Sequence, residues 1–183
     1  MPLSVAPLAD DGAASHLKKG QRLPDITLTS TAGRQVSLAT VPGLVVAFVY
    51  PWSGRPGAPN PPAWDDIPGA HGSTPEAEGF RNLAQAFHEL GAQVFGISAQ
   101  DTAHQQEFAA RLQLPYELLS DEAFKLQAAL RLPTFETGGV TYLKRLTLGL
   151  RDGRIERVYY PVSYPAAHAR EVCAWLGMQH RTL

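Results

Sequence analysis

The sequence predicts an α/β domain in which a mixed central β-sheet is flanked by helices and preceded by a β-hairpin. Two continuous runs of β-branched and aromatic residues, Leu44–Tyr50 and Gln93–Ser98, are typical of strands covered on both faces. Between them, apolar residues recur at helical spacing from about Thr74 to Leu90, and Gly91 ends the pattern. Strands that alternate with helices indicate an α/β sandwich, here one domain over residues 19–177.

The remaining elements follow in chain order. Residues 1–18 show no periodic pattern, and we expect them to form a flexible arm. Alternation from Ile26 to Leu38 around a turn at Gly33 predicts the hairpin. Three further helices and two further strands are predicted: helices over Asp101–Leu112, Ser120–Leu126 and Tyr164–Leu176, and strands over Tyr142–Leu150 and Arg154–Tyr160. Asp152 and Gly153 give a strong hairpin signal between those strands, and residues 178–183 form a tail.

The composition argues against several classes of protein. The 16 Lys and Arg against 17 Asp and Glu give a formal charge of −1, whereas nucleic-acid binders usually carry a clustered basic excess. The longest apolar run, Leu44–Tyr50, is far shorter than the roughly 18 residues that cross a bilayer. We therefore expect neither a nucleic-acid nor a membrane partner.

Cysteine and histidine usage also limits the possibilities. Cys173 is the single cysteine, which excludes an intramolecular disulfide and a Cys-rich metal site. The six histidines show no metal-ligand spacing, so no metal is expected. With no signal-peptide pattern visible, a reducing, cytoplasmic location is the expectation.

A long proline-rich loop, Pro51–Gly72, separates the first buried strand from the helix that follows it. It holds six prolines, and compact domains rarely carry such a loop without a use for it. In α/β folds, ligands bind beyond the carboxyl ends of the central strands, which is where this loop begins. Trp52 and Trp64 are interpreted as anchors that pin the loop, and Arg55 either adds positive potential or is simply solvated.

The loop ends in the start signal of a helix, Gly72-Ser73-Thr74-Pro75-Glu76. Ser73 is predicted to cap the helix, Glu76 to reciprocate three residues later, and Pro75 to lie in the first turn. A helix N-terminus also presents free amides and a positive dipole end, which would stabilise an anion there.

Several segments together resemble the peroxiredoxins, most closely the Q type related to bacterioferritin comigratory protein. They are Phe48–Pro51, Gly72–Arg81, Gly96–Ser98, Leu119–Asp121, Lys144–Leu148 and Asp152–Ile155. The resemblance extends from about Lys19 to Leu176 and implies a thioredoxin-like fold. It also implies thiol-dependent reduction of hydrogen peroxide or organic hydroperoxides, without a metal, flavin or haem cofactor.

The resemblance assigns roles to individual positions. Ser73 stands where the family has its peroxide-attacking cysteine, Arg145 where an arginine holds thiolate and peroxide, and Pro51 where a proline closes over the site. The alternative for Arg145 is an exposed strand arginine in an ion pair. The amides of Gly72 to Thr74 would polarise the site. The family's hydroxyl position is Ala70 here, so Ser53 or Thr74 would supply that group.

Two departures affect the expected activity. Serine stays protonated at neutral pH and cannot enter the cysteine oxidation series, so the chain as given should be inactive. Glu78 occupies the position of the resolving cysteine in many relatives, which implies an external thiol reductant, either thioredoxin-like or of low molecular weight. Cys173 is either a small buried apolar residue or a distant resolving thiol.

Two explanations of Ser73 remain open. It is either an engineered substitution that removes reactivity, or a native serine in a non-catalytic binding or regulatory module of the same fold. His71 precedes Gly72-Ser73 directly, but the sequence lacks the GxSxG elbow of a serine hydrolase. The resemblance further implies a monomer or a weak homodimer.

Overall fold

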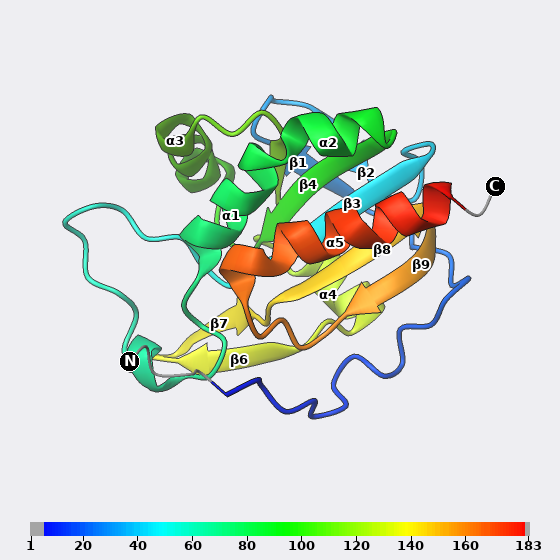
Figure 1. Ribbon diagram of the computed structural model, residues 1–183. Coiled ribbons are helices and arrows are strands. Elements are labelled where there is room, and N and C mark those ends of the chain that lie inside the picture. The colour runs from blue at the N-terminus through cyan, green and yellow to red at the C-terminus, as the bar shows by residue number, and fades with distance from the viewer. Residues whose placement is uncertain (1–5, 182–183) are drawn as a thin grey trace.

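The computed structural model describes residues 6–181, and a central twisted sheet with helices packed on both faces dominates it (Figure 1). The first five residues of the predicted arm and the last two of the predicted tail lie outside the described residues. Among the residues described, no helix is long and apolar enough to cross a membrane.

Seven strands form the central sheet in the order β2-β1-β5-β4-β3-β8-β9. The three middle strands β5, β4 and β3 are mutually parallel, and the flanking pairs are antiparallel, so the sheet is mixed as predicted. Its strands are β1 (Thr27–Ser30), β2 (Gln35–Ser37), β3 (Leu44–Val49), β4 (Ala92–Ser98), β5 (Glu117–Ser120), β8 (Leu146–Arg151) and β9 (Arg154–Tyr159). A separate hairpin consists of β6 (Thr134–Thr137) and β7 (Val140–Leu143).

Five α-helices and one 3₁₀ turn complete the described fold. They are η1 (Trp64–Asp66), α1 (Ser73–Asn82), α2 (Ala84–Glu89), α3 (Thr102–Leu112), α4 (Lys125–Leu130) and α5 (Pro165–His180). Asp101 caps α3, because its carboxylate accepts a hydrogen bond from the amide of His104 at 2.7 Å.

The strand β3 separates two hydrophobic cores. Its residues alternate between faces, so Val45, Ala47 and Val49 join one core while Val46 and Phe48 join the other. Helices α1, α2, α3 and α5 contribute side chains to the core of Val46 and Phe48. The opposite core receives α4 and the segment before β1. Burial of both faces explains the continuous apolar run in the sequence.

Parts of the arm and the tail differ from the prediction. Ala14 and Leu17 are 6% and 5% exposed and belong to the core on the α4 side, so residues 6–18 are not a loose arm. Helix α5 continues to His180, which makes residues 178–180 helical. In the arm, apolar side chains pack on the domain although the local sequence has no clear period, whereas residues 178–180 extend α5 while remaining exposed.

Three predicted elements differ from the observed ones, because each is divided or begins later than the sequence pattern indicates. The helix expected over residues 74–90 is divided at Leu83, whose backbone is not helical, although its amide still bonds to the carbonyl of Gly79. The helix expected from Ser120 begins only at Lys125, because Ser120 ends β5 and the Asp121 carboxylate accepts the amides of Leu126 and Gln127.

The strand expected over Tyr142–Leu150 is interrupted at Lys144 and Arg145. Here the chain leaves the β6–β7 hairpin, and the Lys144 amide bonds to the carbonyl of Pro133 at 2.8 Å before β8 enters the central sheet. Leu146 then pairs with Val49, the last residue of β3. This register places Arg145 at the carboxyl end of β3, beside the proline-rich loop and the start of α1.

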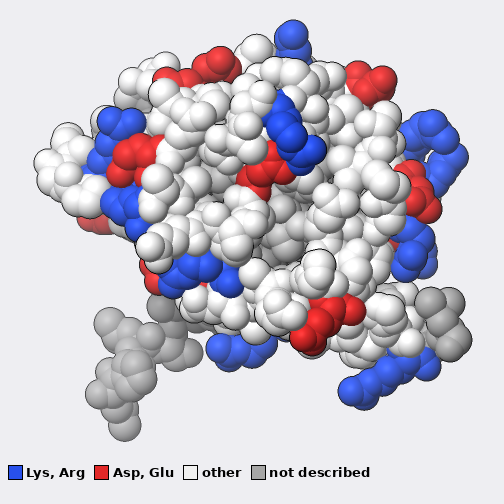
Figure 2. Space-filling view, turned by 90° about the horizontal axis from the view of Figure 1, so that it is seen from above, with Lys and Arg blue, Asp and Glu red and all other residues white. Residues whose placement is uncertain are grey.

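Charged residues are mixed on the surface. Figure 2 shows basic and acidic side chains interspersed over the face seen from above, without a continuous region of one sign. That distribution agrees with the near-zero net charge of the sequence.

Candidate active site

The site is built around the first turn of α1. Gly72 is the N-cap residue, with φ of 116°, and Ser73 is the first residue of the helix, with 5% of its surface exposed. The predicted capping arrangement is therefore wrong: within residues 6–181 no side chain caps α1, and neither Ser73 nor Glu76 bonds to the backbone as a cap would. Both side chains are instead engaged by an arginine from a distant strand.

Arg145 connects Ser73, Glu76 and the end of the loop. Its Nη2 donates to the hydroxyl oxygen of Ser73 at 3.2 Å and to the carbonyls of Ala70 and His71 at 3.2 Å each. Its Nη1 donates to the carboxylate of Glu76 at 2.8 Å. Only 4% of Arg145 is exposed, so the alternative of an exposed strand arginine is excluded.

Glu76 is the functional residue whose role the sequence reasoning missed. It is fully buried, and burial raises the pKa of its carboxyl to about 7, although the charge of Arg145 acts in the opposite direction. Its second oxygen, Oε2, and Nε of Arg145 have no hydrogen-bond partner among the described residues. Near neutral pH the Glu76 carboxyl therefore neutralises the charge of Arg145 only in part. The guanidinium can attract a second anion at position 73.

Replacing Glu76 with glutamine should change how stability depends on pH. The folded-state pKa lies above that of an unfolded glutamate, so the folded protein binds this proton more tightly and loses stability as pH rises from about 4.5 to about 7. The unfolding free energy of Glu76→Gln should therefore rise relative to the parent over that range, by about 3 kcal/mol at most. Urea unfolding at four pH values measures this difference. If the unfolding free energies of the parent and the variant changed with pH in parallel, the raised pKa of Glu76 would be contradicted.

A pocket of about 320 Å³ opens over Ser73. The predicted substrate-binding residues Ser53, Gly72 and Thr74 line it together with Ser73. Pro51 does not: it is buried and lines a neighbouring hollow with Gln100 and His104, so its predicted contact with the site is not observed. Arg55 and Arg111 also line the pocket, which places two cations near its opening.

Ser53 is fixed by residues that the sequence did not single out. Its amide and hydroxyl both donate to Oε1 of Gln100 at 3.0 Å, and Gln100 Nε2 donates back to the Ser53 carbonyl at 3.0 Å. Nε2 of His104 lies 2.7 Å from the same carbonyl. The Ser53 hydroxyl is thus already hydrogen-bonded to Gln100. Of the two predicted hydroxyl residues, Thr74 is therefore the less engaged.

Aromatic contacts hold the rest of the loop, as the sequence predicted. Trp64 is buried and packs edge-on against Trp52, with ring centroids 5.4 Å apart, and against Tyr142 at 5.1 Å. Arg111 adds a hydrogen bond from Nη2 to the carbonyl of Gly54 at 2.8 Å. The loop is therefore attached to the β6–β7 hairpin and to α3, which gives the pocket fixed walls.

Gly72 is required at its position for two reasons. Its φ of 116° is unfavourable for other residues, and a Cβ there would lie 2.7 Å from Cγ of Pro165 at the start of α5. Gly72→Ala should destabilise the fold by about 1–3 kcal/mol. Gly57→Ala is the matched control, because its φ of 80° carries similar strain but a Cβ there would have no atom of the described residues within 4 Å. Equal losses for both variants in urea unfolding would show that the Pro165 contact has no energetic effect.

Neither candidate resolving position reaches the pocket. Glu78 is a half-buried helix residue that forms an ion pair with Arg81 at 3.6 Å. Cys173 lies on α5 and packs against the core of Phe48, and burial raises the pKa of its thiol. Neither residue lines the space over Ser73.

His71 does not support a serine-hydrolase arrangement. Its Nε2 pairs with the carboxylate of Asp65 in the loop, while the Ser73 hydroxyl is bonded by Arg145. Within residues 6–181 no group of three or more His, Cys, Asp or Glu side chains could hold a metal ion. The chemistry available at Ser73 is therefore that of a buried cation, a helix N-terminus and a small pocket.

Comparison with known proteins identifies the family and the fold. Residues 18–172 match the Redoxin family. Peroxiredoxin Q of Arabidopsis thaliana chloroplasts is 32% identical over 88% of this chain and 68% of its own length, and the chain spans about two thirds of the plant relatives it matches. The crystal structure of peroxidoxin BcpB from Mycobacterium tuberculosis superimposes with a TM-score of 0.72 at 28% identity, covering 89% of this chain and 98% of that one.

A second solved structure supports the fold alone. Xylella fastidiosa PrxQ, in the form of a cysteine-to-serine mutant, superimposes with a TM-score of 0.74 at 23% identity, covering 90% of this chain and 98% of that one. The thioredoxin-like α/β fold predicted from the resemblance is thereby confirmed. The chain belongs to the peroxiredoxin family, and its relatives are peroxiredoxins of the Q type.

Proposed function

We propose that this fold and site perform thiol-dependent reduction of hydrogen peroxide and organic hydroperoxides when residue 73 is cysteine, and that the chain with Ser73 is an inactive form. One observation carries the proposal: Nη2 of Arg145 lies 3.2 Å from the side-chain oxygen at the first residue of α1. A sulfur atom there would lie at a helix N-terminus beside a buried cation, the environment that favours a thiolate.

The proposed reaction needs that thiolate. The sulfur attacks the nearer oxygen of the O–O bond and becomes a sulfenic acid, while the other oxygen leaves and is protonated to water or an alcohol. Arg145 stabilises the thiolate before the attack and the oxygen that gains charge during it. The hydroxyl of Ser73 remains protonated near pH 7 and has no equivalent oxidised state, so the cycle does not begin.

The return to the thiol requires an external reductant in this proposal. One thiol displaces water from the sulfenic acid to form a mixed disulfide, and a second thiol releases the protein as thiolate and leaves as a disulfide. Glu78 supplies no sulfur, and Cys173 does not line the pocket. A thioredoxin-like protein or a low-molecular-weight thiol would therefore supply both electrons.

A second candidate is a non-catalytic binding module in which Ser73 is native. The contact between Ser73 and Arg145 favours it, since these two side chains already form a hydrogen bond without a thiol. A natural gene that encodes cysteine at position 73 would exclude this candidate.

Peroxide consumption with dithiothreitol as reductant separates the two candidates. Ser73→Cys should remove hydrogen peroxide catalytically, whereas the chain as given should match the rate without protein. Folded Ser73→Cys protein without activity toward hydrogen peroxide or an organic hydroperoxide would favour the binding module.

A further inference from the structure

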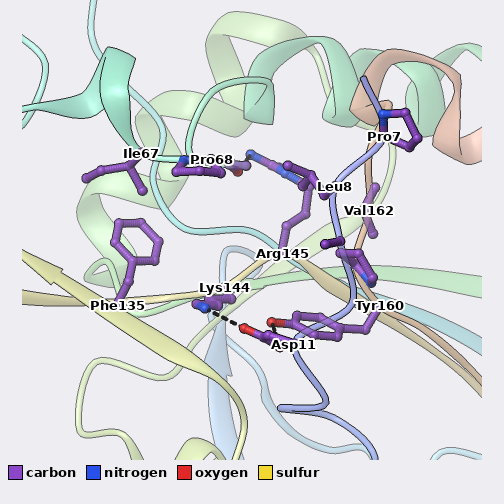
Figure 3. Close-up of a pocket in the computed structure, with 13 residues that line it drawn as sticks. Pro7, Leu8, Asp11, Ile67, Pro68, Phe135, Lys144, Arg145, Tyr160 and Val162 are labelled. Carbon is purple, nitrogen blue, oxygen red and sulfur yellow. Dashed lines mark hydrogen bonds and ion pairs between the residues drawn. The ribbon is translucent and has the colours of Figure 1, made fainter. Parts of the chain in front are cut away.

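A second cavity of the described chain is separate from the pocket over Ser73. It measures about 490 Å³, a size typical of small-molecule sites, and Figure 3 shows the side chains around it. Its walls come from the segment before β1, the loop before α1, the β6–β7 hairpin, the junction before β8 and the segment after β9. Arg145 belongs to this lining and also bonds Ser73, so the two spaces share one side chain.

Apolar side chains form most of the walls. Leu8, Ile67, Phe135 and Val162 surround the space in Figure 3. The segment that carries Leu8 is fixed at this place, because the Leu8 amide donates to the hydroxyl of Ser163 at 3.0 Å. The walls would accommodate a compact aromatic or aliphatic body.

One side of the cavity carries an ion pair. Nζ of Lys144 lies 3.0 Å from the Asp11 carboxylate, which also accepts the hydroxyl of Tyr160 at 2.8 Å. Backbone and side-chain hydrogen bonds from Ala13, Lys144 and Tyr160 lower the pKa of Asp11 to about 2, so the pair is a cation beside an anion at neutral pH.

This polar side distinguishes among head groups. Between these two side chains, a carboxylate would be repelled by Asp11 and an ammonium group would be repelled by Lys144. A hydroxyl can instead donate to the Asp11 carboxylate and accept from the Lys144 ammonium group.

We propose that this cavity binds an uncharged amphipathic alcohol, with its hydroxyl between Asp11 and Lys144 and its apolar body against Leu8, Ile67, Phe135 and Val162. The proposal is independent of the peroxidase activity proposed above, because it concerns the chain with Ser73 and requires no reaction. An occupant would also contact Arg145, whose guanidinium holds Ser73.

The test is a titration of ¹⁵N-labelled chain with 3-phenyl-1-propanol, followed by two-dimensional NMR. The amides of Leu8, Gly69 and Val162 should shift together and reach saturation. Propylbenzene, 3-phenylpropionate and 3-phenylpropylamine keep the apolar body but replace the head, and each should bind at least about tenfold more weakly. Equal binding of the acid or the amine would overturn the assigned head group, and no saturable shift with the alcohol would overturn the site.

Two cavity-filling variants locate the ligand. Leu8→Trp and Ile67→Trp each introduce an indole ring at a half-buried lining position. Each should therefore weaken binding of 3-phenyl-1-propanol by tenfold or more. Val140→Trp is the control, because Val140 is half exposed on β7 and does not line the cavity. Thermal unfolding and the NMR spectrum identify folded variants. Unchanged affinity in both filled variants, when folded, would show that the alcohol binds elsewhere.

Discussion

Ser73→Cys is expected to give a thiol with a pKa well below the usual value of about 8.5. The amides at the start of α1 and Nη2 of Arg145, 3.2 Å from the present hydroxyl, both favour the anion. Burial acts in the opposite direction, but two positive groups directly at the atom should outweigh it. We expect the new thiol to react with hydrogen peroxide at least about 100-fold faster than Cys173, whose pKa burial raises.

The pH dependence of alkylation by iodoacetamide measures this thiol directly. The Ser73→Cys/Cys173→Ser double variant isolates it, and Cys173→Ser alone provides the background. A midpoint near or above 8.5 would mean that Arg145 and the helix do not stabilise an anion at this position.

Loss of Arg145 should have the second large effect. In the Ser73→Cys background, Arg145→Met should lower the rate constant of peroxide reduction by about 10²–10³, the usual consequence of removing one preorganised donor from developing negative charge. The thiol pKa should rise in the same variant. Arg145→Lys should recover only part of the rate, since an ammonium group cannot reach Ser73 and Glu76 in the same forked geometry.

Two controls separate this effect from loss of folding. Arg145→Met leaves Glu76 buried without its partner, which destabilises the fold. Adding Glu76→Gln removes that charge, so stability should return while activity stays low. Arg170→Met alters an exposed arginine of α5 and should leave the rate unchanged. A stable Arg145→Met/Glu76→Gln protein with full activity would show that Arg145 is only structural.

The sequence correctly predicted those elements whose structure depends on residues close together in the chain. The apolar run at Leu44–Tyr50 predicted β3 almost to the residue, and Asp152 and Gly153 form the turn between β8 and β9, both with positive φ. Strand β5 was not predicted, because its four residues gain their place by pairing with β4, which is distant in sequence. The β6–β7 hairpin was also missed, although Gly138 and Gly139 gave a turn signal.

The site was predictable only in part. Its two principal residues, Ser73 and Arg145, were assigned from the family resemblance, and the structure brings them into contact. Glu76 was interpreted as a capping partner because three-residue spacing is a local pattern, whereas its partner Arg145 lies 69 positions away. The clamp of Gln100 on Ser53 spans 47 positions and has no local sequence signal.

The most direct test of the proposed function is a single-turnover oxidation. One equivalent of hydrogen peroxide is added to reduced Ser73→Cys protein, dimedone traps any sulfenic acid, and mass spectrometry of peptides locates it. We predict a dimedone adduct at position 73 of the variant, little modification of Cys173 in either protein, and no adduct at position 73 of the chain as given. A residue 73 thiol that stays unmodified while Cys173 is oxidised would contradict the assignment of this position as the peroxide-reducing centre.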